Sequence, residues 1–191
     1  MWLSSFLHEK LEQKLWRSAG QEVLEVPRIG GMTMIRAAVF SDTHGNNFPM
    51  LEAARKARAD VFIHLGDHDR DAQLLRQAFP AAPVWSVCGN CDYSPLSPAR
   101  LTVELGPVRA FLTHGHLYNV SPWHMDSLVY AAEEAGAKIA FFGHTHRAAY
   151  EELGGVTLIN PGTAGRGFEL TYALVSIFDN GAISCEIKKI A

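Results

Sequence analysis

One stretch of the sequence decides the fold, Val39-Phe40-Ser41-Asp42-Thr43-His44-Gly45-Asn46. An apolar run that ends beside Gly and Asn predicts a buried strand whose carboxyl end opens into a loop. In open α/β sheets, ligand sites lie at the carboxyl ends of the strands. Asp42 and His44 are two residues apart, so both side chains can turn toward one point beyond this strand. On its own, such a pair is a weak indication of a metal site.

The same pattern, an apolar run followed by Asp, Asn or His, recurs four more times. The later runs end in Gly66-Asp67, Gly89-Asn90-Cys91-Asp92, His114-Gly115-His116 and Gly143-His144-Thr145-His146. Chance rarely repeats a pattern of this kind so often. The recurrence indicates several strands that deliver polar side chains to one place.

The first half of the chain alternates strands with helices. After the strand that starts at Ile35, a helix is expected with Asn47 as its cap and Pro49 in its first turn. A second helix is expected over 71–79, and the third strand over 84–88 leads to Asn90. Strands that alternate with helices predict right-handed crossovers and a parallel sheet.

The second half is richer in hairpins. Pairs of short strands are expected at 101–105 with 108–113, at 148–153 with 156–160, and at 172–178 with 182–190. A helix is expected to open at Ser121 and Pro122. A parallel half and a hairpin-rich half together predict an α/β fold with two sheets packed face to face and helices outside.

Residues 1–31 differ in character from residues 32–191, which we interpret as the main domain. Apolar residues at helical spacing, followed by Pro27 and the pair Gly30-Gly31, predict a helical extension and a linker. The extension can dock on the domain or on a second subunit, which makes a homodimer possible. Alternatively, translation starts at Met32 or Met34 and the stretch is an accessory.

Composition excludes several classes of protein. The 191 residues are 48% hydrophobic and 19% charged, as in an ordinary globular protein. A formal net charge of −3 argues against an extended nucleic-acid surface, and therefore against a nuclease that acts on polymers. The three scattered cysteines suit a reducing compartment; Cys88 and Cys91 have redox or zinc spacing, but no second pair follows. With neither a membrane span nor a signal peptide in the sequence, we expect a cytoplasmic protein.

The recurring motifs supply oxygen and nitrogen ligands rather than a thiolate cluster. Such a set favours Mn, Fe, Zn, Ni or Co over a structural zinc. Seven ligands are too many for one catalytic ion, but they suit two ions about 3.5–4 Å apart that share a carboxylate. The seven are Asp42, His44, Asp67, Asn90, His114, His144 and His146.

The ordered motifs, including Asn160-Pro161-Gly162-Thr163, resemble those of the calcineurin-like metallophosphoesterases, within them the small prokaryotic phosphodiesterase branch. The resemblance covers about Met34 to Ile190. It implies a four-layer α/β/β/α sandwich of two mixed sheets with a binuclear centre at one edge. It further implies a phosphoesterase, with phosphodiesters favoured over monoesters, that cleaves a small phosphate ester by in-line attack of a metal-bridging hydroxide.

The resemblance also assigns the ligands. One ion is held by Asp42, His44, Asp67 and His146, and the other by Asp67, Asn90, His114 and His144, so that Asp67 bridges the two. Mn is favoured, with Fe, Zn, Ni or Co as alternatives. A neutral amide at Asn90 adds a ligand without adding charge and leaves the ions more electrophilic. Asp67 and Asn90 are therefore expected to be essential for catalysis.

The chain departs from the larger superfamily at Cys91, where many members carry a histidine that acts as general acid. A thiol is poorly suited to protonate an alkoxide. Either the leaving group needs little help, or another group supplies the proton. His116 is the candidate, although it can instead orient a ligand.

Other residues near the motifs have open roles. Arg147 or Arg166 can bind a phosphate or form a surface salt bridge, and Cys91 can contact the substrate. Asp92 either orients its neighbours or caps a turn. His64 is expected in the core, His68 in a loop, and His124 in the first turn of a helix.

A different function also remains open. The fold implied here resembles that of the retromer scaffold subunit, which binds partner proteins and has lost catalytic competence. A scaffold of that kind should have eroded ligands, whereas all seven are present here. The physiological substrate and the native metal do not follow from the sequence.

Overall fold

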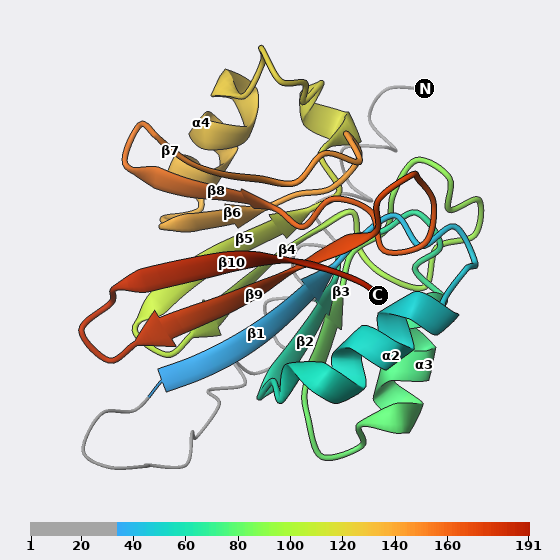
Figure 1. Ribbon diagram of the computed structural model, residues 1–191. Helices are drawn as coiled ribbons and strands as arrows, with labels where there is room; N and C mark the ends of the chain where they lie inside the picture. Colours follow the sequence, from blue (N-terminus) through green and yellow to red (C-terminus); the bar gives the residue numbers. More distant parts are fainter. Residues whose placement is uncertain (1–33) are drawn as a thin grey trace.

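The computed structural model describes residues 34–191, so the predicted helical extension over 1–31 lies outside the described residues (Figure 1). The division of the chain at residue 31 stays a prediction. In chain order the elements are β1 (Met34–Phe40), α2 (Phe48–Ala57), β2 (Val61–His64), α3 (Asp71–Ala78), β3 (Val84–Ser86), β4 (Arg100–Leu105), β5 (Val108–Thr113), the 3-10 turn η1 (His116–Tyr118), α4 (Asp126–Glu134), β6 (Ile139–Phe141), β7 (Ala149–Leu153), β8 (Val156–Asn160), β9 (Thr171–Phe178) and β10 (Ile183–Lys189).

The strands form two five-stranded mixed sheets. The first has the order β10-β9-β1-β2-β3, and the second has the order β4-β5-β6-β8-β7. In the first sheet β1, β2 and β3 run parallel, and in the second β5, β6 and β8 run parallel. The remaining strands pair antiparallel at the edges.

The two sheets pack face to face, with α2 and α3 against the outer face of the first and α4 against the outer face of the second (Figure 1). Three apolar cores hold the four layers together. Along β1 the side chains alternate, so that Val39 enters the core between the sheets while Phe40 enters the core under α2 and α3. The predicted four-layer α/β/β/α sandwich of two mixed sheets is confirmed.

The sequence did not assign the C-terminal hairpin to a sheet. The C-terminal hairpin β9-β10 joins the first sheet, because β9 pairs with β1 from Met34 opposite Phe178 to Val39 opposite Ala173. Each sheet therefore combines a parallel centre with antiparallel edge strands. The third strand also ends early, at Ser86 instead of residue 88, because the Cys88 N–H leaves the sheet and donates to the Pro98 carbonyl at 2.9 Å.

Two helix starts differ from the prediction. Helix α2 has Pro49 in its first turn as expected, but the Asn47 side chain does not cap it. Instead, Asn47 Nδ2 donates to Asp71 Oδ1 at 3.1 Å. Helix α4 begins at Asp126 rather than near Ser121, because Ser121 and His124 exchange two backbone hydrogen bonds in a turn before the helix. His124 is therefore an exposed turn residue.

Within residues 34–191, no helix has both the length and the apolar character that crossing a membrane requires.

Candidate metal centre

The carboxyl ends of the central strands of both sheets meet at one edge of the molecule. The loops after β1 and β2 are joined by the Asp42 N–H, which donates to Gly66 O at 3.1 Å, and by the His44 N–H, which donates to Asp67 O at 3.1 Å. Across the two sheets, the His144 N–H donates to Asp42 Oδ2 at 3.2 Å. The recurring sequence pattern therefore ends in a single cluster of side chains.

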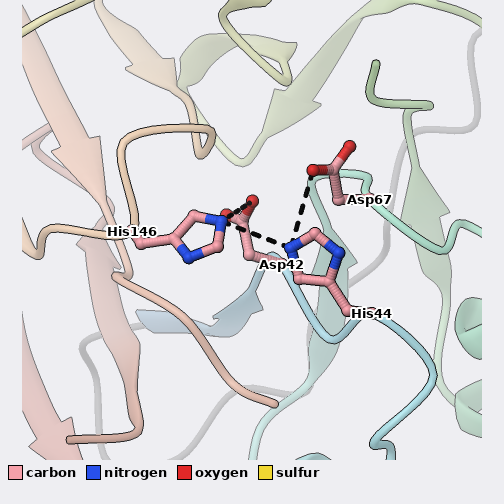
Figure 2. Close-up of side chains that lie close together, drawn as sticks. All are labelled: Asp42, His44, Asp67 and His146. Carbon is pink, nitrogen blue, oxygen red and sulfur yellow. Dashed lines mark hydrogen bonds and ion pairs between the residues drawn. The ribbon is translucent and has the colours of Figure 1, made fainter. Parts of the chain in front are cut away.

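Four of the predicted ligands form the first half of this cluster, Asp42, His44, Asp67 and His146 (Figure 2). One ligand atom from each lies within 4.8 Å of all the others. His146 Nε2 is 3.1 Å from Asp42 Oδ1 and 3.3 Å from His44 Nε2. Two carboxylates and two imidazoles at these spacings make a donor set for a borderline divalent ion.

The second half of the cluster centres on His114, which is fully buried. Its Nδ1 lies 2.7 Å from the carbonyl oxygen of Leu65, so Nδ1 must carry the proton and donate. In the neutral ring, Nε2 then presents a lone pair toward Asp67 Oδ1 at 3.3 Å. Within the described part of the chain this buried nitrogen has no hydrogen-bond partner. A lone pair that faces a carboxylate is repelled unless a cation or a proton lies between them, so the donor set fits a metal ion.

Asp67 reaches both halves of the cluster. Its Oδ1 faces His114, whereas its Oδ2 faces His44 Nε2 at 3.7 Å. The carboxylate is 3% exposed, and the backbone N–H of Cys91 donates to Oδ1 at 2.9 Å. Gly89 permits this approach, since a β-carbon there would collide with the same oxygen. Asp67 thus has the geometry of a bridging ligand.

The structure brings six of the seven predicted ligands together and leaves Asn90 at the rim. The ring centroid of His144 is 5.2 Å from that of His114, which places His144 in the second half. Asn90, in contrast, is exposed, and its Nδ2 donates to Cys91 Sγ at 3.4 Å. Its backbone nevertheless lies near Asp67, because both neighbours in sequence, Gly89 and Cys91, contact the Asp67 carboxylate.

The backbone at the ligands is unusual. A positive φ is rare for residues other than glycine, and each such residue costs on the order of 1–3 kcal/mol unless its surroundings impose it. Residues of this kind gather at functional sites. Five of the seven predicted ligands have positive φ: Asp42 (55°), His44 (48°), Asp67 (53°), His144 (65°) and His146 (56°).

Buried polar residues hold these strained loops. Asn160 Nδ2 donates to Gly143 O at 2.8 Å and lies 3.1 Å from Thr145 Oγ1, which fixes the loop that carries His144 and His146. The sequence analysis assigned no role to Asn160. A single amide in a short motif does not indicate that its side chain supports another loop.

His64 is a core residue, as predicted, and it also links two ligand loops. Its Nδ1 accepts from the Gly66 N–H at 3.3 Å, and its Nε2 is 3.1 Å from Thr43 Oγ1, which in turn lies 3.5 Å from Asp67 O. Burial lowers the pKa of His64 to about 4, so the ring is neutral near pH 7.

The electrostatics of the cluster differ between its two halves. The contact with Asp42 raises the pKa of His146, although burial opposes the shift. Burial and the neighbouring His114 lower the pKa of His144, and the same two causes lower that of His116. His116 and His144 are therefore neutral imidazoles near pH 7.

The remaining predicted residues surround the cluster. The ring centroid of His116 lies 5.4 Å from that of His114, and its Nδ1 is buried without a hydrogen-bond partner among the described residues. Burial and the nearby Asp67 raise the pKa of the Cys91 thiol to about 11. Arg147 is exposed, with its N–H on Thr145 Oγ1 at 3.3 Å.

Asp92 caps turns rather than facing the ligands. Its carboxylate accepts the backbone N–H groups of His68 at 2.8 Å, Asp69 at 3.0 Å and Gly89 at 2.7 Å. It thereby joins the loop after β2 to the loop after β3. His68 lies in a loop, as predicted, with its Nδ1 3.0 Å from Asp71 Oδ2.

Comparison with known proteins agrees with this geometry. Residues 35–180 match the family model described as the calcineurin-like phosphoesterase superfamily domain. The chain is similar to the probable metallophosphoesterase YsnB of Bacillus subtilis, with 34% identity over 128 residues that cover 65% of this chain and 72% of that protein. It is also similar to the phosphodiesterase MJ0936 of Methanocaldococcus jannaschii, with 34% identity over 62 residues that cover 32% of this chain and 33% of that protein.

Solved structures show the same fold. A predicted phosphoesterase from Streptococcus pneumoniae aligns with a TM-score of 0.65 and 27% identity, over 82% of this chain and 98% of that one. Vps29 of Entamoeba histolytica, solved in complex with zinc, aligns with a TM-score of 0.62 and 20% identity, over 82% of this chain and all of that one.

Proposed function

The chain belongs to the calcineurin-like phosphoesterase superfamily, and from this membership we propose that it is a binuclear metal-dependent phosphodiesterase. The observation that carries the proposal is the carboxylate of Asp67, whose two oxygens face two separate groups of donors. When bound, two divalent ions would supply an acidified water as nucleophile and positive charge for the phosphoryl oxygens. Mn is the proposed metal, and a small phosphate ester is the proposed substrate.

The residues would divide as follows. Asp42, His44 and His146 would hold one ion and His114 and His144 the other, with Asp67 shared by both. Asn90 would complete the second set with its amide oxygen. Its side chain is exposed and, among the described residues, hydrogen-bonded only to a thiol, so turning toward the cluster costs little.

His116 is the proposed partner of the leaving group. It lies beside the second half of the cluster, and its lowered pKa makes it a neutral imidazole whose N–H can donate to the departing oxygen. The Cys91 thiol is a weaker hydrogen-bond donor than an imidazole N–H, and we assign it only a contact with the substrate.

A preference for diesters is supported by one relative, since MJ0936 is itself named a phosphodiesterase. Purified, Mn-loaded protein assayed against phosphomonoesters, aryl phosphodiesters and cyclic nucleotides tests this preference directly. Faster turnover of a phosphomonoester than of every diester would overturn it.

The reaction itself is tested with Asp67→Ala and Asn90→Ala. Both variants should lose Mn-dependent hydrolysis of bis(4-nitrophenyl) phosphate, because each removes a proposed ligand. Glu104→Ala is the matched control: Glu104 pairs with Arg109 near the β4-β5 turn, at the opposite end of these strands from His114. Undiminished turnover in the Asp67 or Asn90 variant rejects the assignment.

A protein-interaction scaffold is the second candidate, because the fold matches Vps29. Metal uptake alone does not separate the two functions, since that Vps29 was solved with zinc. Two equivalents of Mn by isothermal titration together with ester hydrolysis would support the enzyme. Fewer than two equivalents with no hydrolysis of any ester in the panel would support the scaffold.

A further inference from the structure

We propose that Arg166 is the side chain that binds the phosphoryl group, held in place by a loop that is anchored directly to the ligand loop after β1. This inference rests on the proposed function, since it concerns the same site. The sequence left Arg147 and Arg166 as equal candidates. The contacts of the two loops separate them.

Thr163 is the first anchor of this loop. Its hydroxyl oxygen lies 2.9 Å from the carbonyl oxygen of Asp42 and 2.8 Å from that of Arg166, so its one proton is available to both carbonyls. The Arg166 N–H donates back to the same hydroxyl at 3.1 Å. Because Thr163 is 3% exposed, these bonds are shielded from water, and they fix the Arg166 backbone relative to a proposed ligand.

The residues between Thr163 and Arg166 supply further anchors. The Ala164 N–H donates to Ser41 O at 2.9 Å, and Asn46 Nδ2 donates to Gly165 O at 2.7 Å. Gly165 lies so close to the loop after β1 that a β-carbon would collide with the carbonyl oxygen of Thr43. The loop over 163–166 is thus attached along the whole length of the stretch that carries Asp42 and His44.

The Arg166 side chain is available to bind an anion. It is exposed and forms no salt bridge with any of the described residues, whereas Arg55, Arg109, Lys188 and Lys189 are each paired with a carboxylate.

Arg147 is also exposed and has no salt bridge among the described residues, but its backbone is anchored differently. It follows His146 directly, but within the described structure its one hydrogen bond runs from its backbone N–H to a neighbouring threonine in the same loop. The contacts of its loop with Asp42 come from His144 and His146 rather than from Arg147 itself.

The chemistry of the guanidinium suits the task. It stays charged at every pH at which the enzyme can work, and its planar fork of N–H groups matches two oxygens of a phosphate. A lysine supplies the charge without the fork. Arg166 is therefore expected to contribute to binding through both charge and geometry.

The test is a titration of Mn-loaded protein with inorganic phosphate, followed by calorimetry, together with KM for bis(4-nitrophenyl) phosphate. Arg166→Ala should raise the dissociation constant for phosphate about 10- to 100-fold, as expected for loss of a hydrogen-bonded charged contact. The dissociation constant of Arg166→Lys should lie between those of the wild type and Arg166→Ala. Added guanidinium ion should partly restore phosphate binding to Arg166→Ala. Mn stoichiometry and the melting temperature should not change, because the side chain has no ion-pair partner within residues 34–191.

Arg55→Ala is the control, an exposed arginine on α2 whose one ion pair among the described residues is with Glu52. Wild-type phosphate affinity in Arg166→Ala overturns the inference, and so does a loss of affinity in Arg147→Ala but not in Arg166→Ala. Phosphate binding is measured without turnover. A wild-type protein that binds phosphate through Arg166 but hydrolyses no ester would refute the proposed function and leave this inference standing.

Discussion

Replacing Asp67 by Asn should separate metal binding from folding. Asp67 has φ of 53°, a conformation that Asn tolerates better than most residues, and an Asn oxygen can still accept the N–H of Cys91. The change removes one negative charge from a carboxylate that is 3% exposed and that the metal-free protein leaves without a cation. We therefore expect the metal-free variant to melt at or above the temperature of the metal-free wild type.

The response to Mn should differ sharply. A ligand at 100 times its dissociation constant stabilises a protein by about 2.7 kcal/mol for each site. For a domain of this size, 1 kcal/mol shifts the melting temperature by about 2–4 °C, so two sites should raise that of the wild type by roughly 10–20 °C. In Asp67→Asn, the loss of the shared ligand should remove most of this rise.

The assay is differential scanning calorimetry of both proteins with and without Mn. A variant that keeps the full Mn-dependent rise would show that Asp67 does not bridge two ions. A variant that is unfolded without metal would show that the carboxylate is needed for the fold itself. Either result would refute the reasoning.

Two further predictions concern the support of the site. Gly143→Ala should weaken Mn binding at least about tenfold and destabilise the protein by about 1–3 kcal/mol, because the added β-carbon would collide with Ser41 Oγ and crowd Asp42 Oδ2. Mn titration measures the first effect and denaturant unfolding measures the second. Wild-type values for both would contradict this account. His64 has a pKa of about 4 in the folded protein and near 6.5 in the unfolded chain, so the unfolded chain binds the proton more readily. The free energy of unfolding should therefore decrease as pH falls from 6.5 toward 4, by up to about 3 kcal/mol. Urea unfolding of the metal-free protein across this range should show that loss in the wild type but not in His64→Gln, which can keep the bond to Thr43; equal slopes in the two proteins would refute it.

The gathering of these side chains at one edge could be predicted because its signal is local. Each motif places a ligand directly after an apolar run, and the carboxyl ends of parallel strands share an edge, so convergence follows once the strands are identified. The pairing of β9 with β1 could not be predicted in this way. Alternation identifies a strand, but it does not say that residue 178 lies opposite residue 34.

The details that sequence reasoning missed depend on long-range contacts. Asn47 is a good helix cap by type, yet Asp71, which is 24 residues away, takes its side chain. The anchors of Arg166 are also remote in sequence, since Thr163 contacts Asp42 and Gly165 contacts Asn46. Residue type and spacing contain no information about these partners.

The strained backbone at the ligands is the least predictable feature and explains the polar residues around them. A positive φ at five ligand positions would relax if the loops were free, so their surroundings must impose it. Thr163 and Asn160, both buried, supply bonds to two of these loops, at Asp42 and at Gly143. The donor atoms are thereby positioned before any ion arrives, unlike those of zinc fingers, in which the metal drives folding. Preorganisation of this kind places the free-energy cost of gathering like charges on folding, and a bound cation would relieve that repulsion.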